Sequence, residues 1–152
     1  MSWCLSGLSD ELEARLYGVL ANRRWAQAAA SGGLDAAGRV MDELTDEEWL
    51  AAMQAHPRIG ERGGHAPASS EREQSRAMQS PPAILAALAA ENRIYEEKFG
   101  HVFLIAAGGR TGDEILGELR RRMRNDPATE FEEAKRELRQ IVRLRLQALA
   151  SS

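Results

Sequence analysis

The chain has 152 residues, of which 43% are hydrophobic and 28% charged, and its formal net charge is −3. This length fits one domain, and the slightly acidic balance lacks the basic excess that nucleic-acid binding normally requires. No apolar run reaches the roughly 18 residues of a membrane span, and the acidic N-terminal sequence does not resemble a signal peptide. A single cysteine, Cys4, excludes an internal disulfide. We therefore expect a cytoplasmic protein that binds neither nucleic acid nor a membrane.

Helical signals dominate the chain from its N-terminus onward. Apolar residues recur at helical spacing, and capping residues such as Ser9, Thr45 and Thr111 precede the periodic segments. Residues 57–69 indicate an irregular loop, and the apolar run 101–109 could be extended or helical. The expected helices span about residues 10–29, 46–55, 70–79, 83–98, 111–123 and 129–150. We predict an all-α fold, a single compact domain of about seven to eight helices over residues 1–152.

Glycine and proline set several of these helix ends. The Ser-Gly-Gly stretch at 31–33 should end the first helix. Pro57 disfavours the α conformation at His56, so the second helix should stop at Ala55 or His56. Gly100 should close the helix over residues 83–98.

One arginine falls on the apolar face of the last expected helix. At 100° per residue, Arg145 lies within the arc of the apolar residues, whereas Arg143 points to the opposite side. That arc contains Phe131, Ala134, Leu138, Ile141, Val142 and Leu149. A buried arginine is costly unless it is paired or binds an anion. A side chain that reaches solvent near the helix end, a structural salt bridge and an anion site all fit this pattern.

Two other polar residues, Asn92 and His56, could likewise have either a structural or a functional role. Asn92 lies on the apolar face of its helix, where a buried amide needs hydrogen-bond partners, most often backbone groups. His56 follows a helix, where histidine is most often a cap or a surface residue. His65 is nine residues further on, no cysteine is near and no HExxH pattern is present, so we expect no metal site. His65 itself should be a solvent-facing loop residue. Ser70 and Glu73 have the spacing of a helix capping box.

Taken together, these motifs form a specific series. HPRIG at 56–60 is followed by SxxEQ at 70–74, NxxYxxKFG at 92–100, Phe103, Arg-Met-x-Asn at 122–125, Glu130 and Arg145-Leu146. Over roughly residues 9–150 the series resembles the 2-oxo-4-hydroxy-4-carboxy-5-ureidoimidazoline (OHCU) decarboxylase family of urate degradation. The resemblance implies an all-α enzyme without a cofactor, commonly a homodimer, that converts a small anionic ureidoimidazoline to (S)-allantoin.

The resemblance also implies the site residues. It implies that His56, Glu73 and Arg145 are catalytic. His56 would act as general acid or base, and Glu73 would orient the substrate hydroxyl or polarise His56. Arg145 would donate hydrogen bonds to substrate oxygens. The implied substrate-binding positions are Pro57, Ser70, Glu71, Arg72, Gln74, Leu104, Ile105, Ala106, Ala107 and Gly108.

The chain departs from the family pattern at two places. His101 stands where an aromatic residue is usual, and residues 31–38 lack a common Pro-Phe pair. Two other functions stay open: a non-catalytic helical interaction module, and a lyase of the same scaffold with a different small anionic heterocycle as substrate. The direction of the Glu73 carboxylate distinguishes two arrangements of the site, because a carboxylate that faces substrate cannot also cap Ser70.

Overall fold

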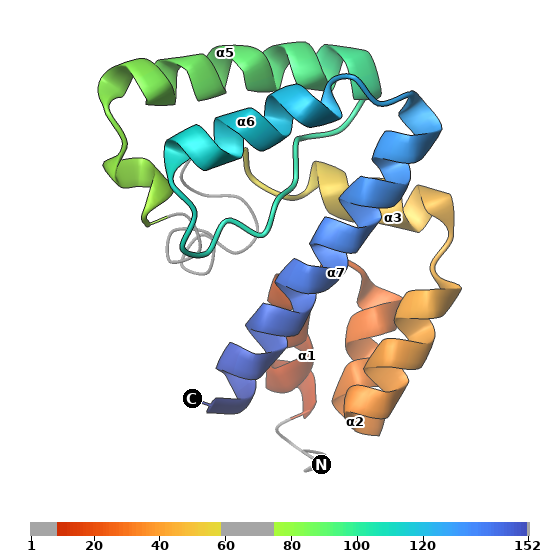
Figure 1. Ribbon diagram of the computed structural model, residues 1–152. Helices are drawn as coiled ribbons and strands as arrows, with labels where there is room; N and C mark the ends of the chain where they lie inside the picture. Colours follow the sequence, from red (N-terminus) through yellow and green to blue (C-terminus); the bar gives the residue numbers. More distant parts are fainter. Residues whose placement is uncertain (1–8, 59–74, 152) are drawn as a thin grey trace. The chain divides into compact units, whose positions relative to one another are not determined.

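The computed structural model describes residues 9–58 and 75–151 (Figure 1). These residues form six α-helices and one 3₁₀ turn, with no strand among them, so the predicted all-α class is confirmed. The chain divides into two compact units, Met1–Ala55 and His56–Ser152. The prediction of one domain over residues 1–152 stays a prediction. Within the described ranges, no helix is long and apolar enough to cross a membrane.

The first unit begins with two helices where the sequence predicted one. Helix α1 spans Ser9–Val19 and helix α2 spans Arg23–Glu43. The break between them was missed because Asn22 adopts an extended conformation and caps α2, its side chain accepting a hydrogen bond from the Trp25 N–H at 2.8 Å. Asparagine is among the best N-cap residues, and here this local preference prevails over the continuous apolar periodicity.

Helix α2 bends sharply at Gly33. This glycine has φ 74° and ψ −160°, a conformation that favours a residue without a side chain. In a straight helix Trp25 and Ala37 would lie about 18 Å apart, yet the Trp25 indole N–H donates to the Ala37 carbonyl oxygen at 2.9 Å. The two halves of α2 therefore fold against each other. The Ser-Gly-Gly stretch does interrupt the helix as predicted, but the helical turns that follow it, up to Glu43, were missed.

Helix α3 spans Asp46–Gln54 with Ala55 as its C-cap, so it stops before Pro57 as predicted, one residue short of the predicted end at Ala55 or His56. It begins at a capping box in which Thr45 Oγ1 accepts from the Glu48 N–H and the Glu48 carboxylate accepts from the Thr45 N–H. The same carboxylate accepts hydrogen bonds from Arg24 at 2.8 Å and Asn22 at 3.0 Å. These bonds, that of Arg24 above all, lower the pKa of Glu48 to about 2.

The second unit contains the 3₁₀ turn η1 at Ala77–Gln79 and three helices, α5 at Pro82–Phe99, α6 at Gly112–Arg122 and α7 at Pro127–Ser151. Gly100, with φ 81°, closes α5, as predicted, and the predicted start of α6 at Thr111 is confirmed by a capping box. Helix α7 begins two residues earlier than predicted, because proline is favoured in the first helical turn and Asp126 accepts from the Thr129 N–H at 2.8 Å. Half of the helix predicted over residues 70–79, residues 70–74, lies outside the described residues, and the other half contains the turn η1 instead of an α-helix.

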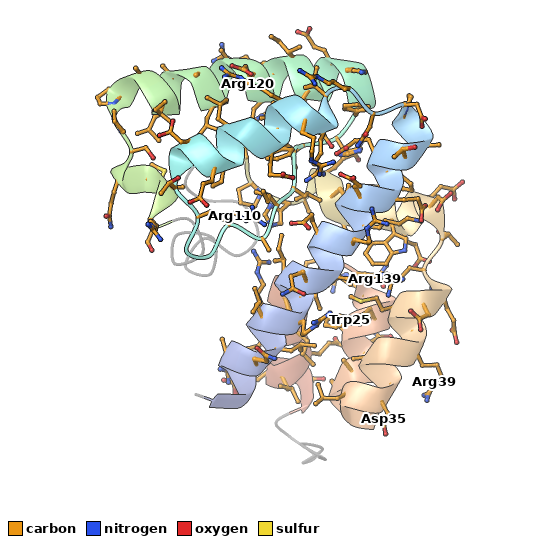
Figure 2. All side chains as sticks on the ribbon, viewed as in Figure 1. Trp25, Asp35, Arg39, Arg110, Arg120 and Arg139 are labelled. Carbon is orange, nitrogen blue, oxygen red and sulfur yellow. The ribbon has the colours of Figure 1, made fainter. Side chains whose placement is uncertain are left out.

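Helices α5 and α6 lie side by side (Figure 1). Arg120 of α6, labelled in Figure 2, donates two hydrogen bonds to Glu91 of α5, at 2.9 and 2.7 Å. The coil between these helices runs through the core of the unit. Buried members of that core are Ala77, Leu88, Tyr95, Phe103, Ile105, Ala107, Ile115, Leu116 and Leu119. The segment 101–109, for which the sequence left extended and helical structure open, is therefore an irregular segment, and it contributes Phe103, Ile105 and Ala107 to the core.

Candidate active site

His56 is buried, with 6% of its surface exposed, and it lies against Arg145 of α7. Its Nδ1 is 3.0 Å from the Pro57 carbonyl oxygen, and its Nε2 is 3.5 Å from Arg145 Nη2. A carbonyl can only accept and a guanidinium can only donate. Both contacts are therefore satisfied by a neutral imidazole that carries its proton on Nδ1 and its lone pair on Nε2. The surface role that is commonest for such a histidine is wrong here.

Arg145 is buried as its helical phase predicted, with 5% exposure. It shares its face of α7 with Leu138, Ile141 and Val142, each 2% exposed. This burial excludes a side chain that extends into solvent. An arginine in such surroundings needs partners for its donors, and Nε2 of His56 is one that the structure provides.

The residues after His56 are held against helix α5. Pro57 is buried, and Arg58 forms two hydrogen bonds with the Glu96 carboxylate, at 2.6 and 2.9 Å. A bidentate pair of this kind fixes orientation as well as distance. No sequence pattern points to Glu96, because a glutamate at a partly exposed helix position has no distinguishing spacing.

The predicted substrate-binding stretch 104–108 contains three buried residues and two more exposed ones. Leu104, Ile105 and Ala107 are at most 3% exposed, whereas Ala106 is half-buried and Gly108 is exposed. The Ala106 N–H donates to Glu137 Oε1 at 2.8 Å. Side chains of the protein thus hold the backbone of this irregular stretch in place.

A buried polar network lies next to this stretch. Arg122 donates from Nε and Nη2 to Glu130 Oε2, at 2.8 and 2.6 Å, and from Nη1 to the Leu104 carbonyl oxygen at 2.6 Å. Tyr95 also donates its hydroxyl proton to Glu130, and Asn125 donates to the other carboxylate oxygen at 3.1 Å. Burial, then the bond to Glu130, raise the pKa of Tyr95, so its hydroxyl stays a donor. Arg122 was quoted in the motif series, but the sequence did not indicate its burial, because arginines also flank it.

Asn92 is buried, with 1% exposure, as its position on the helix predicted. Neither Oδ1 nor Nδ2 has a hydrogen-bond partner among the described residues. The backbone partner expected for it is therefore not found in this part of the chain.

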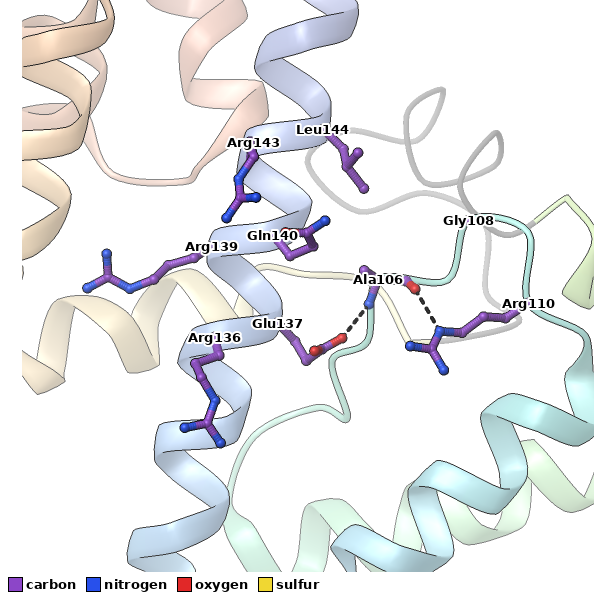
Figure 3. Close-up of a pocket in the computed structure, with 9 residues that line it drawn as sticks. All are labelled: Ala106, Gly108, Arg110, Arg136, Glu137, Arg139, Gln140, Arg143 and Leu144. Carbon is purple, nitrogen blue, oxygen red and sulfur yellow. Dashed lines mark hydrogen bonds between the residues drawn. The ribbon is translucent and has the colours of Figure 1, made fainter.

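A pocket of about 600 Å³ opens between α7 and the segment 106–110 (Figure 3). Its lining comprises Ala106, Gly108, Arg110, Arg136, Glu137, Arg139, Gln140, Arg143 and Leu144. Four arginines and one glutamate give this lining a formal charge of +3, in a chain whose net charge is −3. The pocket-lining face of α7 points away from the face that carries Arg145, so neither Arg145 nor His56 is among the lining residues.

The structure thus brings together His56, Pro57 and Arg145 of the predicted site. Glu73, the third predicted catalytic residue, lies outside the described residues, as do His65 and the substrate-binding candidates Ser70, Glu71, Arg72 and Gln74. Whether Glu73 caps Ser70 or faces substrate therefore stays open. Within residues 9–58 and 75–151, no group of three or more His, Cys, Asp or Glu side chains is arranged to hold a metal ion.

The chain has relatives with urate-degrading functions in their names. The uric acid degradation bifunctional protein TTL of Arabidopsis thaliana is 40% identical over 116 residues, which are 72% of this chain and 36% of that protein. A 2-oxo-4-hydroxy-4-carboxy-5-ureidoimidazoline decarboxylase of Haloferax volcanii is 30% identical over 115 residues, covering 75% of this chain and 68% of that protein. The match therefore spans about a third of the bifunctional relative and two-thirds of the archaeal one.

A similar solved structure and a matching family model both agree with these relatives. A crystal structure of OHCU decarboxylase in the presence of (S)-allantoin matches with a TM-score of 0.77 at 31% sequence identity, and the match covers 91% of this chain and 99% of that one. The family model described as OHCU decarboxylase matches residues 9–147, across both compact units. The chain belongs to the OHCU decarboxylase family.

Proposed function

We propose that this protein decarboxylates 2-oxo-4-hydroxy-4-carboxy-5-ureidoimidazoline to (S)-allantoin, without a cofactor, as a step of urate degradation. The observation that carries the proposal is the pairing of buried His56 with buried Arg145 in a chain of this family. A histidine and an arginine side by side combine a group that can transfer a proton near neutral pH with a donor that binds carboxylate or carbonyl oxygens.

The substrate itself supplies the electron sink for this reaction. Its carboxylate and hydroxyl share one ring carbon, and the bond between that carbon and the carboxylate breaks as CO₂ leaves. The electron pair forms a C=C bond with the carbon of the adjacent C=N, and the nitrogen of that C=N takes up a proton as it receives the displaced π pair. The same carbon then gains a second proton and becomes the stereocentre of allantoin. The hydroxyl loses its proton as the ring carbonyl forms. The protein must therefore hold the carboxylate out of the ring plane and deliver a proton to one face.

His56 and Arg145 have different roles in this reaction. His56 acts as the acid–base group through Nε2, since its Nδ1 is occupied by the Pro57 carbonyl oxygen. Arg145 donates to substrate oxygens and orients the anion. Glu73 orients the substrate hydroxyl or polarises His56, while Ser70, Gln74 and the residues between them bind the amide-like edges; this part of the proposal rests on the family resemblance.

The reaction can be followed with substrate made in situ. Urate is converted by uricase and hydroxyisourate hydrolase, and the decay of the intermediate is recorded by absorbance and circular dichroism with and without the protein. We expect faster decay and an excess of one allantoin enantiomer. Equal decay rates and a racemic product would reject the proposed activity.

The family resemblance also leads us to propose a homodimer that works in the cytoplasm. Light scattering coupled to size-exclusion chromatography should give a mass of about twice the 16.8 kDa of one chain. A mass equal to one chain across the working concentration range would reject the dimer.

A further inference from the structure

We propose that Glu137 and Arg122 are positioning residues that set the backbone of residues 104–108 for substrate binding. The inference rests on the proposed function, because it concerns the stretch that the proposed substrate would contact. Neither residue is among the predicted site residues. Each one instead acts on the site through a peptide group of the 104–108 stretch.

Arg122 fixes one end of this stretch from the core. Its Nη1 donates to the Leu104 carbonyl oxygen at 2.6 Å, and the guanidinium lies over the ring of Phe103, 4.6 Å from its centroid. Glu130 holds the same guanidinium through Nε and Nη2. Because Arg122 is 1% exposed and Glu130 is 0% exposed, this donor has one orientation. The peptide after Leu104 is therefore locked in direction.

Glu137 fixes the middle of the stretch from α7. Its Oε1 accepts from the Ala106 N–H at 2.8 Å, while Arg110 Nε donates to the Ala106 carbonyl oxygen at 3.1 Å (Figure 3). Both polar backbone groups of Ala106 are thus engaged by side chains. Substrate would then be bound by other groups of the stretch, whose directions follow from these fixed peptides.

An irregular segment needs such external bonds to be a reliable binding surface. Residues 102–107 belong to no helix or strand, so no regular hydrogen-bond ladder orients their peptides. Ile105 and Ala107 anchor the segment in the apolar core, which sets its position but not the rotation of its peptide planes. A binding group misplaced by about 1 Å can cost on the order of a hundredfold in rate.

The test compares three variants of α7. Glu137→Leu removes the acceptor for the Ala106 N–H, and Glu137→Gln keeps an oxygen acceptor at the same place. Glu132→Leu is the matched control, because it removes an exposed carboxylate from the same helix, one that pairs with Lys135 rather than with the 104–108 stretch. Steady-state kcat and KM are measured for each with substrate made in situ, alongside the thermal midpoint.

We expect Glu137→Leu to raise KM by roughly tenfold, because the loss of a hydrogen bond to a charged group changes an equilibrium constant by about this factor. Glu137→Gln should stay within about twofold of the wild type, and Glu132→Leu should leave KM unchanged. A purely structural role would lower the folded fraction and thus the apparent kcat, without moving KM. An unchanged KM in Glu137→Leu would overturn the inference, as would a KM in Glu137→Gln that is raised as much as in Glu137→Leu.

Arg122→Lys provides the second arm, since it keeps the charge but lacks the fork that bonds Glu130 and Leu104 together. We expect its KM to rise as well; a wild-type KM in folded Arg122→Lys would remove Arg122 from the inference. Should this variant not fold, the Glu137 series decides alone. A wild-type protein without activity on the ureidoimidazoline would reject the proposed function before any variant is compared.

Discussion

His56 Nε2 and Arg145 Nη2 lie 3.5 Å apart, although 89 residues separate them in the chain. With the Pro57 carbonyl oxygen 3.0 Å from Nδ1, the imidazole is held in one tautomer between an acceptor and a donor. The geometry leaves the Nε2 lone pair directed at a cation. A substrate carboxylate that binds Arg145 would therefore come close to the atom best suited to exchange a proton.

We predict that the imidazole of His56 adopts the tautomer with its proton on Nδ1. Nitrogen-15 NMR of the labelled protein measures this directly, because protonated and unprotonated ring nitrogens have well-separated shifts. A signal pattern with the proton on Nε2 would contradict the hydrogen-bond arrangement around Pro57 and Arg145.

His56→Ala should lower kcat by roughly 10²- to 10⁴-fold, the usual contribution of a positioned acid–base group. The far-ultraviolet circular dichroism spectrum should not change, because His56 lies outside the helices. Retention of the full rate would remove His56 from the chemistry.

Arg145→Lys should reduce kcat/KM by roughly tenfold to a hundredfold, since lysine keeps the charge but loses the planar set of donors. Arg143→Lys is the matched control, because Arg143 is exposed and lies two residues away on the other side of α7. Equal losses in the two variants would show that the effect does not depend on the pairing with His56.

Glu130→Ala should lower the free energy of unfolding by about 3–5 kcal/mol, because it removes the buried carboxylate nearest to the Arg122 guanidinium, at 2.6 Å, and leaves only Glu133 at 3.5 Å. Glu132→Ala, at an exposed position of the same helix, should change it by no more than about 0.5 kcal/mol. Urea denaturation measures both. A loss in Glu130→Ala as small as in the control would mean that the buried ion pair contributes no stability.

The free energy of unfolding should decrease as the pH is lowered, and Glu48 accounts for part of this decrease. The pKa of this carboxyl is about 2 in the folded protein and 4.5 when unperturbed, so its contribution is complete above pH 4.5 and is lost as the pH falls toward 2. Glu48→Gln should therefore be less stable than the wild type at pH 7, and the difference should shrink at pH 3. A difference that is independent of pH would contradict the assigned bonds to Arg24 and Thr45.

The sequence predicted what depends on local rules. Helical phase placed Arg145 on the apolar face of α7, Gly100 located the C-terminal end of α5, and the capping residue Thr111 located the start of α6. The fold of α2 at Gly33 could not be predicted in this way, because a Ser-Gly-Gly stretch indicates a break without indicating that a second helix starts immediately.

The buried network around Arg122 and Glu130 could not be predicted from local rules, for a different reason. Arg122 lies in a run of arginines, and only its contact with Glu130 and Leu104 distinguishes it from its exposed neighbours. Glu137 likewise resembles any glutamate on a half-exposed helix face. Contacts between residues far apart in sequence decide both cases, and neither periodicity nor spacing contains that information.

The optical activity of the product is the most direct test of stereospecific decarboxylation by His56. With uricase and hydroxyisourate hydrolase generating the intermediate, the circular dichroism of the allantoin formed is compared for the wild type, His56→Ala and a reaction without the protein. We expect (S)-allantoin from the wild type alone, with racemic product in the other two reactions. Racemic allantoin from the wild type, or (S)-allantoin from His56→Ala at the wild-type rate, would contradict this expectation.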